Sequence, residues 1–259
     1  MTAAVLLGLG IGVLLGMVGG GGSILAVPAL MYGVGMPLSR AVPTALLVVG
    51  ISSAVAAVPR MIHRDIGWRI AVAFGGAGVP AAFGGAALNR ILPSRLLLFG
   101  FVALMLIAAW RMLQEDKQTG GDCALPGGGV NWRSCLPKAI ALGAGVGFIT
   151  GLFGVGGGFV IVPALVLLLG LPMTVAVSTS LVIISINSAA GFLAHLGATS
   201  LDATVTIAFT LAAVAGALVA GRVGSRLSGA WLRRGFAYLV VAVAAFVALQ
   251  TVINPTATG

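Results

Sequence analysis

Two glycine runs inside hydrophobic segments could bind an anion through the backbone. They are Gly19–Ser23 and Gly154–Gly158. Consecutive glycines interrupt a helix, because each one costs a helix interior up to about 1 kcal/mol relative to alanine. A helix that restarts after such a break presents unpaired N–H groups with a partial positive charge, which bind anions. Ser23 is a candidate N-cap or ligand, and Pro28 and Pro163 suit a first helical turn or, if they lie deeper, kink the helix.

Polar groups recur at matching positions in the hydrophobic segments after each glycine run. Neutral donors suit a transported anion, because they bind it without the deep trap of a buried arginine and so permit release. The candidate substrate ligands are Gly19, Gly20, Gly21, Gly22, Ser23, Thr44, Ser52, Ser53, Gly154, Gly156, Gly157, Gly158, Thr179, Ser180, Asn187 and Ser188. Two alternatives stay open: the glycines could serve close helix packing, and a Ser or Thr could donate to a carbonyl of its own helix.

The composition indicates that lipid is the solvent for most of the chain. Of its 259 residues, 59% are hydrophobic and 7% are charged, against about 25% charged residues in a soluble domain. The mean hydropathy is +1.16. Segments such as 203–220 and 237–249 are apolar on all sides, whereas barrel strands alternate in polarity. Helices satisfy their own backbone in lipid, so we expect an all-α, multi-pass protein of the cytoplasmic (inner) membrane.

The chain contains an internal duplication. The motif Val27-Pro28-Ala29-Leu30 follows the first glycine run, and Val162-Pro163-Ala164-Leu165 follows the second. Under the same offset, Thr44 falls on Thr179 and Ser53 on Ser188 without a gap. The predicted domains are a first repeat, a polar linker and a second repeat, over residues 1–112, 113–137 and 138–259.

This glycine run followed by Val-Pro-Ala-Leu, present in both halves, resembles the TauE/SafE family of membrane proteins, the sulfite and organosulfonate exporters. The resemblance covers nearly the whole chain. It implies secondary transport of small sulfur-containing anions of the sulfite, thiosulfate or organosulfonate type. Many members have no known substrate, so the resemblance does not name the anion.

The positive charges predict that each glycine run joins the two arms of a helical hairpin. The first apolar segment of each half, 3–35 and 138–170, would form a helix of about 48 Å, longer than the ~30 Å hydrocarbon core. If each segment were one span, seven Lys and Arg would lie on either side of the membrane; with hairpins, eleven of the 14 lie on one side, as the positive-inside rule requires. The expected fold is two inverted repeats, each a glycine-broken helical hairpin followed by three transmembrane helices, with both termini outside. A disulfide between Cys123 and Cys135 is not expected if the linker is cytoplasmic.

The residues that are missing exclude several classes of protein. No Asp or Glu falls within a predicted apolar segment, which disfavours cation carriers and carboxylate proton relays. The two histidines are too few and too peripheral for catalysis, and the two cysteines make a poor zinc site. We therefore expect no enzyme, no metal and no cofactor. The positive-inside rule explains the net charge of +9 better than nucleic-acid binding does.

The expected partners are a small inorganic or organic anion and the lipid bilayer, and a homodimer is compatible with this plan. Three alternatives to a carrier stay open. They are an anion channel, a non-transport membrane subunit and an intramembrane enzyme. Glycine breaks at duplicated positions argue against a subunit with no transport role.

Overall fold

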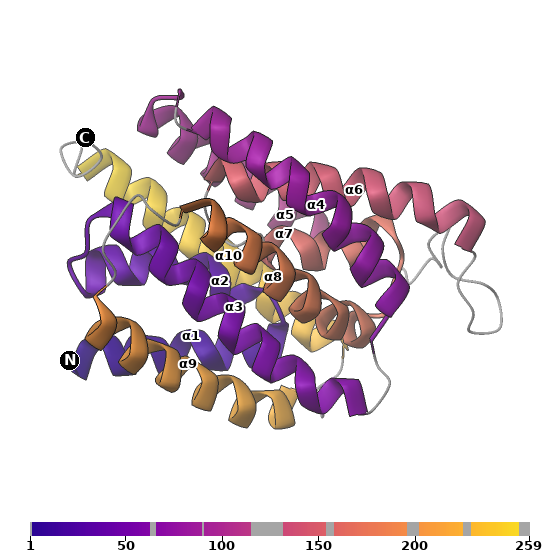
Figure 1. Ribbon diagram of the computed structural model, residues 1–259, viewed down its shortest axis with the longest axis horizontal. Helices are drawn as coiled ribbons and strands as arrows, with labels where there is room; N and C mark the ends of the chain where they lie inside the picture. The colour runs from indigo at the N-terminus through magenta and orange to yellow at the C-terminus, as the bar shows by residue number, and fades with distance from the viewer. Residues whose placement is uncertain are drawn as a thin grey trace.

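The computed structural model describes residues 2–62, 66–89, 91–114, 132–153, 158–195, 202–224 and 229–253, and every regular element in these ranges is a helix (Figure 1). Both halves contain a long helix, a short helix that continues as a π-helical turn, and three more long helices. The first half comprises α1 (Thr2–Val18), α2 (Gly21–Pro28), η1 (Ala29–Gly33), α3 (Leu38–Ile62), α4 (Trp68–Asn89) and α5 (Ser94–Gln114). The second half comprises α6 (Trp132–Phe153), α7 (Gly158–Pro163), η2 (Ala164–Leu168), α8 (Met173–His195), α9 (Ala203–Gly224) and α10 (Gly229–Ile253).

Five of the described helices are long and apolar enough to cross a membrane, namely α3, α4, α6, α8 and α9. The apolar parts of α5 and α10 are shorter, at Phe99–Gln114 and Arg234–Leu249. Large apolar side chains such as Ile107 and Leu211 are exposed on the outside of the bundle, where lipid would cover them. The helical, multi-pass architecture predicted from composition is therefore confirmed.

The chain reverses direction at the first glycine run. Gly22, near the start of α2, packs against Ile11 and Leu15 of α1. Gly33, at the end of η1, packs against Leu7. Positions further along the second arm contact positions nearer the start of α1, so the two arms lie antiparallel, as a hairpin requires.

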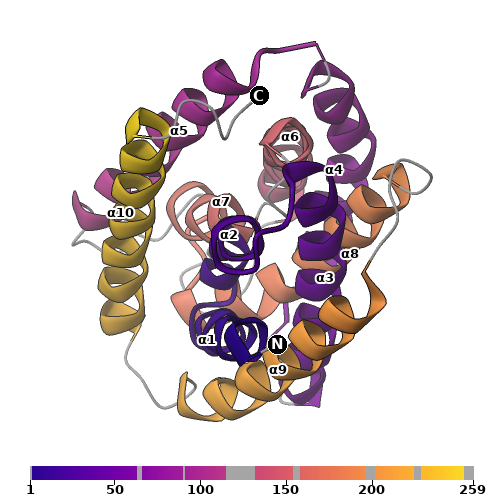
Figure 2. The same ribbon diagram turned by 90° about the vertical axis from the view of Figure 1, so that its left-hand side faces the viewer.

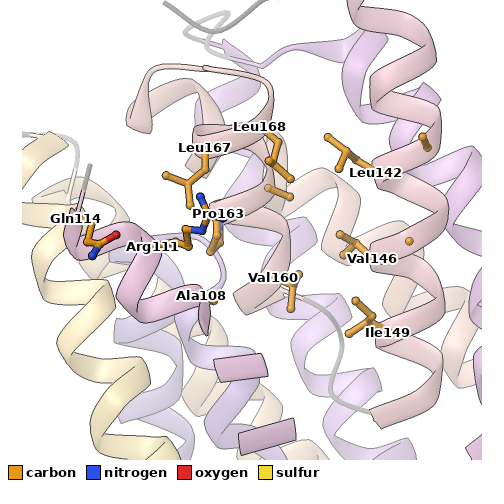
Figure 3. Close-up of a pocket in the computed structure, with 13 residues that line it drawn as sticks. Ala108, Arg111, Gln114, Leu142, Val146, Ile149, Val160, Pro163, Leu167 and Leu168 are labelled. Atoms are coloured by element: carbon orange, nitrogen blue, oxygen red, sulfur yellow. The ribbon is translucent and has the colours of Figure 1, made fainter. Parts of the chain in front are cut away.

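The second half has the same reversal with more widely separated arms. Val160 of α7 faces Val146 and Ile149 of α6, and Leu168 of η2 faces Leu142, across a cleft that both arms line (Figure 3). The order of these facing residues again makes the arms antiparallel. The two halves therefore differ in how tightly their hairpins close.

Pro28 and Pro163 end α2 and α7 rather than begin them. Both have helical backbone angles, and a π-helical turn follows each one. These prolines therefore lie deeper than the first helical turn, which is the second of the two placements that the sequence predicted. A proline at such a position removes one i→i−4 hydrogen bond, and its ring clashes with the preceding turn. The π-helical turns are followed by Gly35 and Gly170, whose φ values of +76° and +69° are unstrained only for glycine.

Glycine allows the two halves to interlock. The most extensive helix pairings are α1 with α9 and α4 with α6. At Gly12 and Gly16, an added Cβ would overlap the backbone of Ala213 and Ala217 in α9. The glycines at the equivalent positions of α6 approach α4 in the same way: Gly147 and Gly151 against Gly78 and Ala82. Helix packing therefore explains these glycines.

The two broken helices lie at the centre of the bundle. Figure 2 shows α2 beside α7, with α5 and α10 on one side and α3, α4 and α8 on the other. The helices α3 and α8 are antiparallel, since Gly50 of α3 lies against Ser188 and Leu46 lies against Gly191, later in α8. The middle of α8 therefore runs past both glycine breaks.

Cys135, in the first turn of α6, is disulfide-bonded. This corrects the expectation that the linker thiols stay free; Cys123 lies outside the described residues. A disulfide is typical of an oxidising compartment, so this finding opposes the cytoplasmic placement of the linker that the charge count favours.

Candidate functional site

The first glycine break is a turn that leaves the start of α2 uncapped. Gly19 has a φ of +76°, and its N–H donates to the carbonyl of Leu15 at 2.8 Å. Gly20 is the N-cap residue of α2, and no side chain caps this helix. Because the first N–H groups of a helix have no intrahelical acceptor, those of α2 carry the partial positive charge that attracts an anion.

Ser23 is not the N-cap, which corrects one of the two roles predicted for it. It is the third residue of α2, and its buried hydroxyl donates to the carbonyl of Gly20 at 2.8 Å. A serine hydroxyl carries one proton. Ser23 could therefore donate to an anion only after its hydroxyl rotates away from Gly20.

The two glycine breaks meet inside the protein. A Cβ at Gly20 would overlap the carbonyl oxygen of Gly158. A Cβ at Gly158 would lie 2.6 Å from the hydroxyl oxygen of Ser23 and 3.0 Å from the carbonyl oxygen of Gly20. Gly20 cannot be replaced without moving backbone, because its close approach is to main-chain atoms of Gly158; a side chain at Gly158 would displace the side chains of Ser23 and Ile184. Gly154, Gly156 and Gly157 of the second run lie outside the described residues.

One face of α8 lines both breaks. A Cβ at Gly19 would lie 2.9 Å from the hydroxyl oxygen of Ser180, and one at Gly158 would lie 2.8 Å from the side chain of Ile184. Ser188 follows Ile184 by four residues on the same helix face and lies against Gly50 of α3. The first break, the start of α7 and the contact between α3 and α8 therefore all lie along this one face of α8.

Five of the predicted polar ligands are buried without a hydrogen-bond partner in the part of the chain that the structure describes. They are Thr44, Ser52, Ser53, Asn187 and Ser188. Buried polar side chains nearly always have a partner, and an unsatisfied one costs about 1–3 kcal/mol. These groups therefore have hydrogen-bonding capacity available for a bound ligand or water.

The other predicted hydroxyls are engaged within the protein. Ser180 donates to the carbonyl of Val177 at 2.8 Å, the local bond that the alternative interpretation predicted. Thr179 accepts a hydrogen bond from the N–H of Gly67 at 3.0 Å, which ties α8 to the residues before α4. Asn187 lies apart from the breaks, because its amide atoms face Gly78 of α4.

Two residues missing from the sequence prediction cap the helices that lead into the breaks. Arg60 of α3 donates to the carbonyl of Gly16 in the last turn of α1 at 2.7 Å. Asn89 of α4 donates to the carbonyl of Leu152 in the last turn of α6 at 2.5 Å. The last carbonyls of a helix lack intrahelical donors and carry partial negative charge. The sequence signal for Arg60 is its positive charge at the end of an apolar segment, which the positive-inside rule explains equally well as a loop charge.

The described part of the arrangement offers the groups that bind an anion. Its donors are backbone N–H groups and hydroxyls. Within the described ranges, no three His, Cys, Asp or Glu residues lie together as a metal site.

Comparison with known proteins decides the family. The sequence profile described as "Sulfite exporter TauE/SafE" matches residues 4–247. The chain belongs to the TauE/SafE family. The resemblance drawn from the two glycine motifs is thereby confirmed, and the expectation that the chain is no enzyme agrees with membership of a family of membrane transporters.

Several relatives of this chain are named as membrane transporters. A "Probable membrane transporter protein" of Xylella fastidiosa is 30% identical over 248 residues, covering 92% of this chain and 90% of the relative. The "Probable membrane transporter protein YunE" of Bacillus subtilis is 29% identical over 251 residues, covering 86% and 87%. The "Probable membrane transporter protein MJ0441" of Methanocaldococcus jannaschii is 29% identical over 203 residues, covering 75% and 72%. No solved structure matches this chain.

Proposed function

We propose that this TauE/SafE protein is a secondary transporter that exports small sulfur-containing anions, of the sulfite, thiosulfate or organosulfonate type, across the cytoplasmic membrane. The observation that carries the proposal is the meeting of two helix breaks, Gly19–Gly20 and Gly158, in the centre of the bundle. The uncapped start of α2 offers N–H groups there, and the buried, unpartnered hydroxyls of Ser53 and Ser188 on α3 and α8 offer further donors.

An inverted repeat is the second part of the proposal. Equivalent helices of the two halves, α3 and α8, run antiparallel, as helices related by a two-fold axis in the membrane plane do. Many secondary transporters bind their substrate where the broken helices of two inverted repeats meet near the bilayer midplane. The repeats would comprise residues 1–112 and 138–259, joined by the linker 113–137.

The sulfur-containing substrate class comes from the family description, and the relatives' names add transport across a membrane. The absence of acidic residues from the predicted apolar segments supports an anion. An anion could leave the cell down the membrane potential, which is worth about 2.3 kcal/mol per charge per 100 mV.

Transport in proteoliposomes tests this proposal. Wild-type protein should move radiolabelled sulfite, thiosulfate or a short organosulfonate with saturable kinetics. Gly158→Ala should lower the rate at least about tenfold, since a 1.4 kcal/mol change in binding is already tenfold. Gly10→Ala is the matched control, because open space surrounds that glycine. Equal rates for both variants would reject the paired-break site, and flux without saturation or counterflow would favour the channel alternative.

A further inference from the structure

A cleft of about 630 Å³ opens between α5, α6 and the α7–η2 arm. Figure 3 shows its walls: Leu142, Val146 and Ile149 on α6 face Val160 and Leu168 on the other arm. The lining is apolar except at one end, where α5 contributes Arg111 and Gln114. The cleft therefore combines a long apolar wall with one cationic, hydrogen-bonding end.

The equivalent region of the first half is closed. Under the internal duplication, Leu167 and Arg111 in the cleft correspond to Tyr32 and Phe246. These two aromatic rings contact each other edge-to-face, with centroids 5.9 Å apart at 85°. The repeat architecture alone therefore does not require the cleft. The half of the protein with the open cleft differs from the closed half in the residues at these two positions.

The outside of the cleft is apolar surface. Trp110 of α5 and Ile140 of α6, next to its lining residues, are exposed by 58% and 45%. In a membrane these faces contact lipid. A lipid chain could enter the cleft from the side without leaving an apolar medium, whereas a small hydrated anion would lose its water against walls that offer no hydrogen bonds.

We infer that the cleft binds one anionic phospholipid of the surrounding bilayer. The phosphate would bind the guanidinium of Arg111 and the amide of Gln114, since charge-assisted hydrogen bonds to phosphate are strong. One acyl chain would lie along Leu142, Val146 and Ile149. Basic pockets between transmembrane helices bind anionic headgroups, and the rest of the lipid would stay in the bilayer outside the cleft.

Native mass spectrometry of the purified full-length protein with phosphatidylglycerol or phosphatidylcholine tests the inference. Wild type should retain one phosphatidylglycerol at least about tenfold more tightly than phosphatidylcholine. Arg111→Gln should remove this preference, while Arg40→Gln, which removes an exposed arginine of α3, should keep it. Gly145→Leu should fill the cleft without a clash, because nothing lies within 4 Å of a Cβ there. Gly10→Leu, its duplicate position with equally open space, should leave binding unchanged.

Two results would overturn the inference. One is retention of phosphatidylglycerol by both Arg111→Gln and Gly145→Leu. The other is displacement of the lipid by millimolar sulfite, which would make the cleft a water-filled path for a small anion. Thermal unfolding of each variant verifies that lost binding does not reflect lost folding.

Discussion

Five polar side chains are buried in the apolar bundle and make no hydrogen bond in the described fold. They are Thr44, Ser52, Ser53, Asn187 and Ser188. Such groups destabilise the free protein unless something binds to them. Buried unsatisfied groups are rare, and a bound ion or water is one of the reasons for which a protein keeps them. These unpartnered side chains therefore favour a binding function for α3 and α8.

Ser188→Ala provides a test at this scale. Removing an unsatisfied buried hydroxyl should leave the free energy of unfolding unchanged or raise it by up to about 1 kcal/mol. The same change should weaken anion binding about fivefold or more. Ser185→Ala is the control, because Ser185 donates to the carbonyl of Leu181 of its own helix. Chemical unfolding together with equilibrium anion binding measures both quantities, and unchanged affinity in Ser188→Ala would count against its role as a ligand.

Gly20→Ala tests the contact between the breaks. An added methyl group would overlap the carbonyl oxygen of Gly158, and overpacking of this kind costs about 1–3 kcal/mol. We expect a lower melting temperature and loss of transport. Gly10→Ala has open space and should be neutral or stabilising. A Gly20→Ala protein as stable and active as wild type would show that the breaks do not touch.

Residue chemistry alone predicted part of this site. Matched positions in the duplication predicted Ser53 and Ser188 as ligands; both are buried without a hydrogen-bond partner in the described fold, and their role as ligands stays a prediction. The duplication separates Ser180 from Ser188, since Ala45 stands at the position equivalent to Ser180. It could not predict the bond from Ser180 to the carbonyl of Val177, because that bond depends on the rotamer of the side chain. Of the two roles offered for Ser23, the N-cap role is wrong, because α2 begins two residues earlier, at Gly21.

At the scale of elements, the two helices that lead into the breaks end in caps supplied by other helices. Arg60 of α3 binds the Gly16 carbonyl of α1, and Asn89 of α4 binds the Leu152 carbonyl of α6. Such caps fix where α1 and α6 stop, and so hold the breaks in position. Length, apolarity and glycine spacing predicted these helices, but not the pairing of α1 with α9, because contacts between halves leave no local pattern.

Arg60→Gln tests this cap. A hydrogen bond from a charged donor contributes about 1.5–3 kcal/mol, so the variant should unfold at lower denaturant concentration by a corresponding amount. Arg40→Gln changes an exposed arginine and should have little effect. If the two variants were equally stable, the guanidinium of Arg60 would serve only as a surface charge.

At the scale of the whole molecule, the charge distribution predicts inverted halves with both termini on the face opposite the linker. Labelling by a membrane-impermeant maleimide in intact cells, in a Cys123→Ser/Cys135→Ser background, measures sidedness. We expect labelling of cysteines placed at Thr2 and Thr256 and protection of one placed at Thr119. Labelling at all three positions would reject the inverted repeat, and labelling at Thr119 alone would place the linker outside, as the disulfide at Cys135 suggests.

The position of a bound anion tests the central claim most directly. Structure determination with 2-bromoethanesulfonate would locate the ligand through the anomalous signal of its bromine. The account predicts a sulfonate at the start of α2, within hydrogen-bonding distance of its first N–H groups and beside Gly158. A sulfonate bound only in the Arg111 cleft, or only outside the bundle, would contradict a transport site built from two glycine breaks.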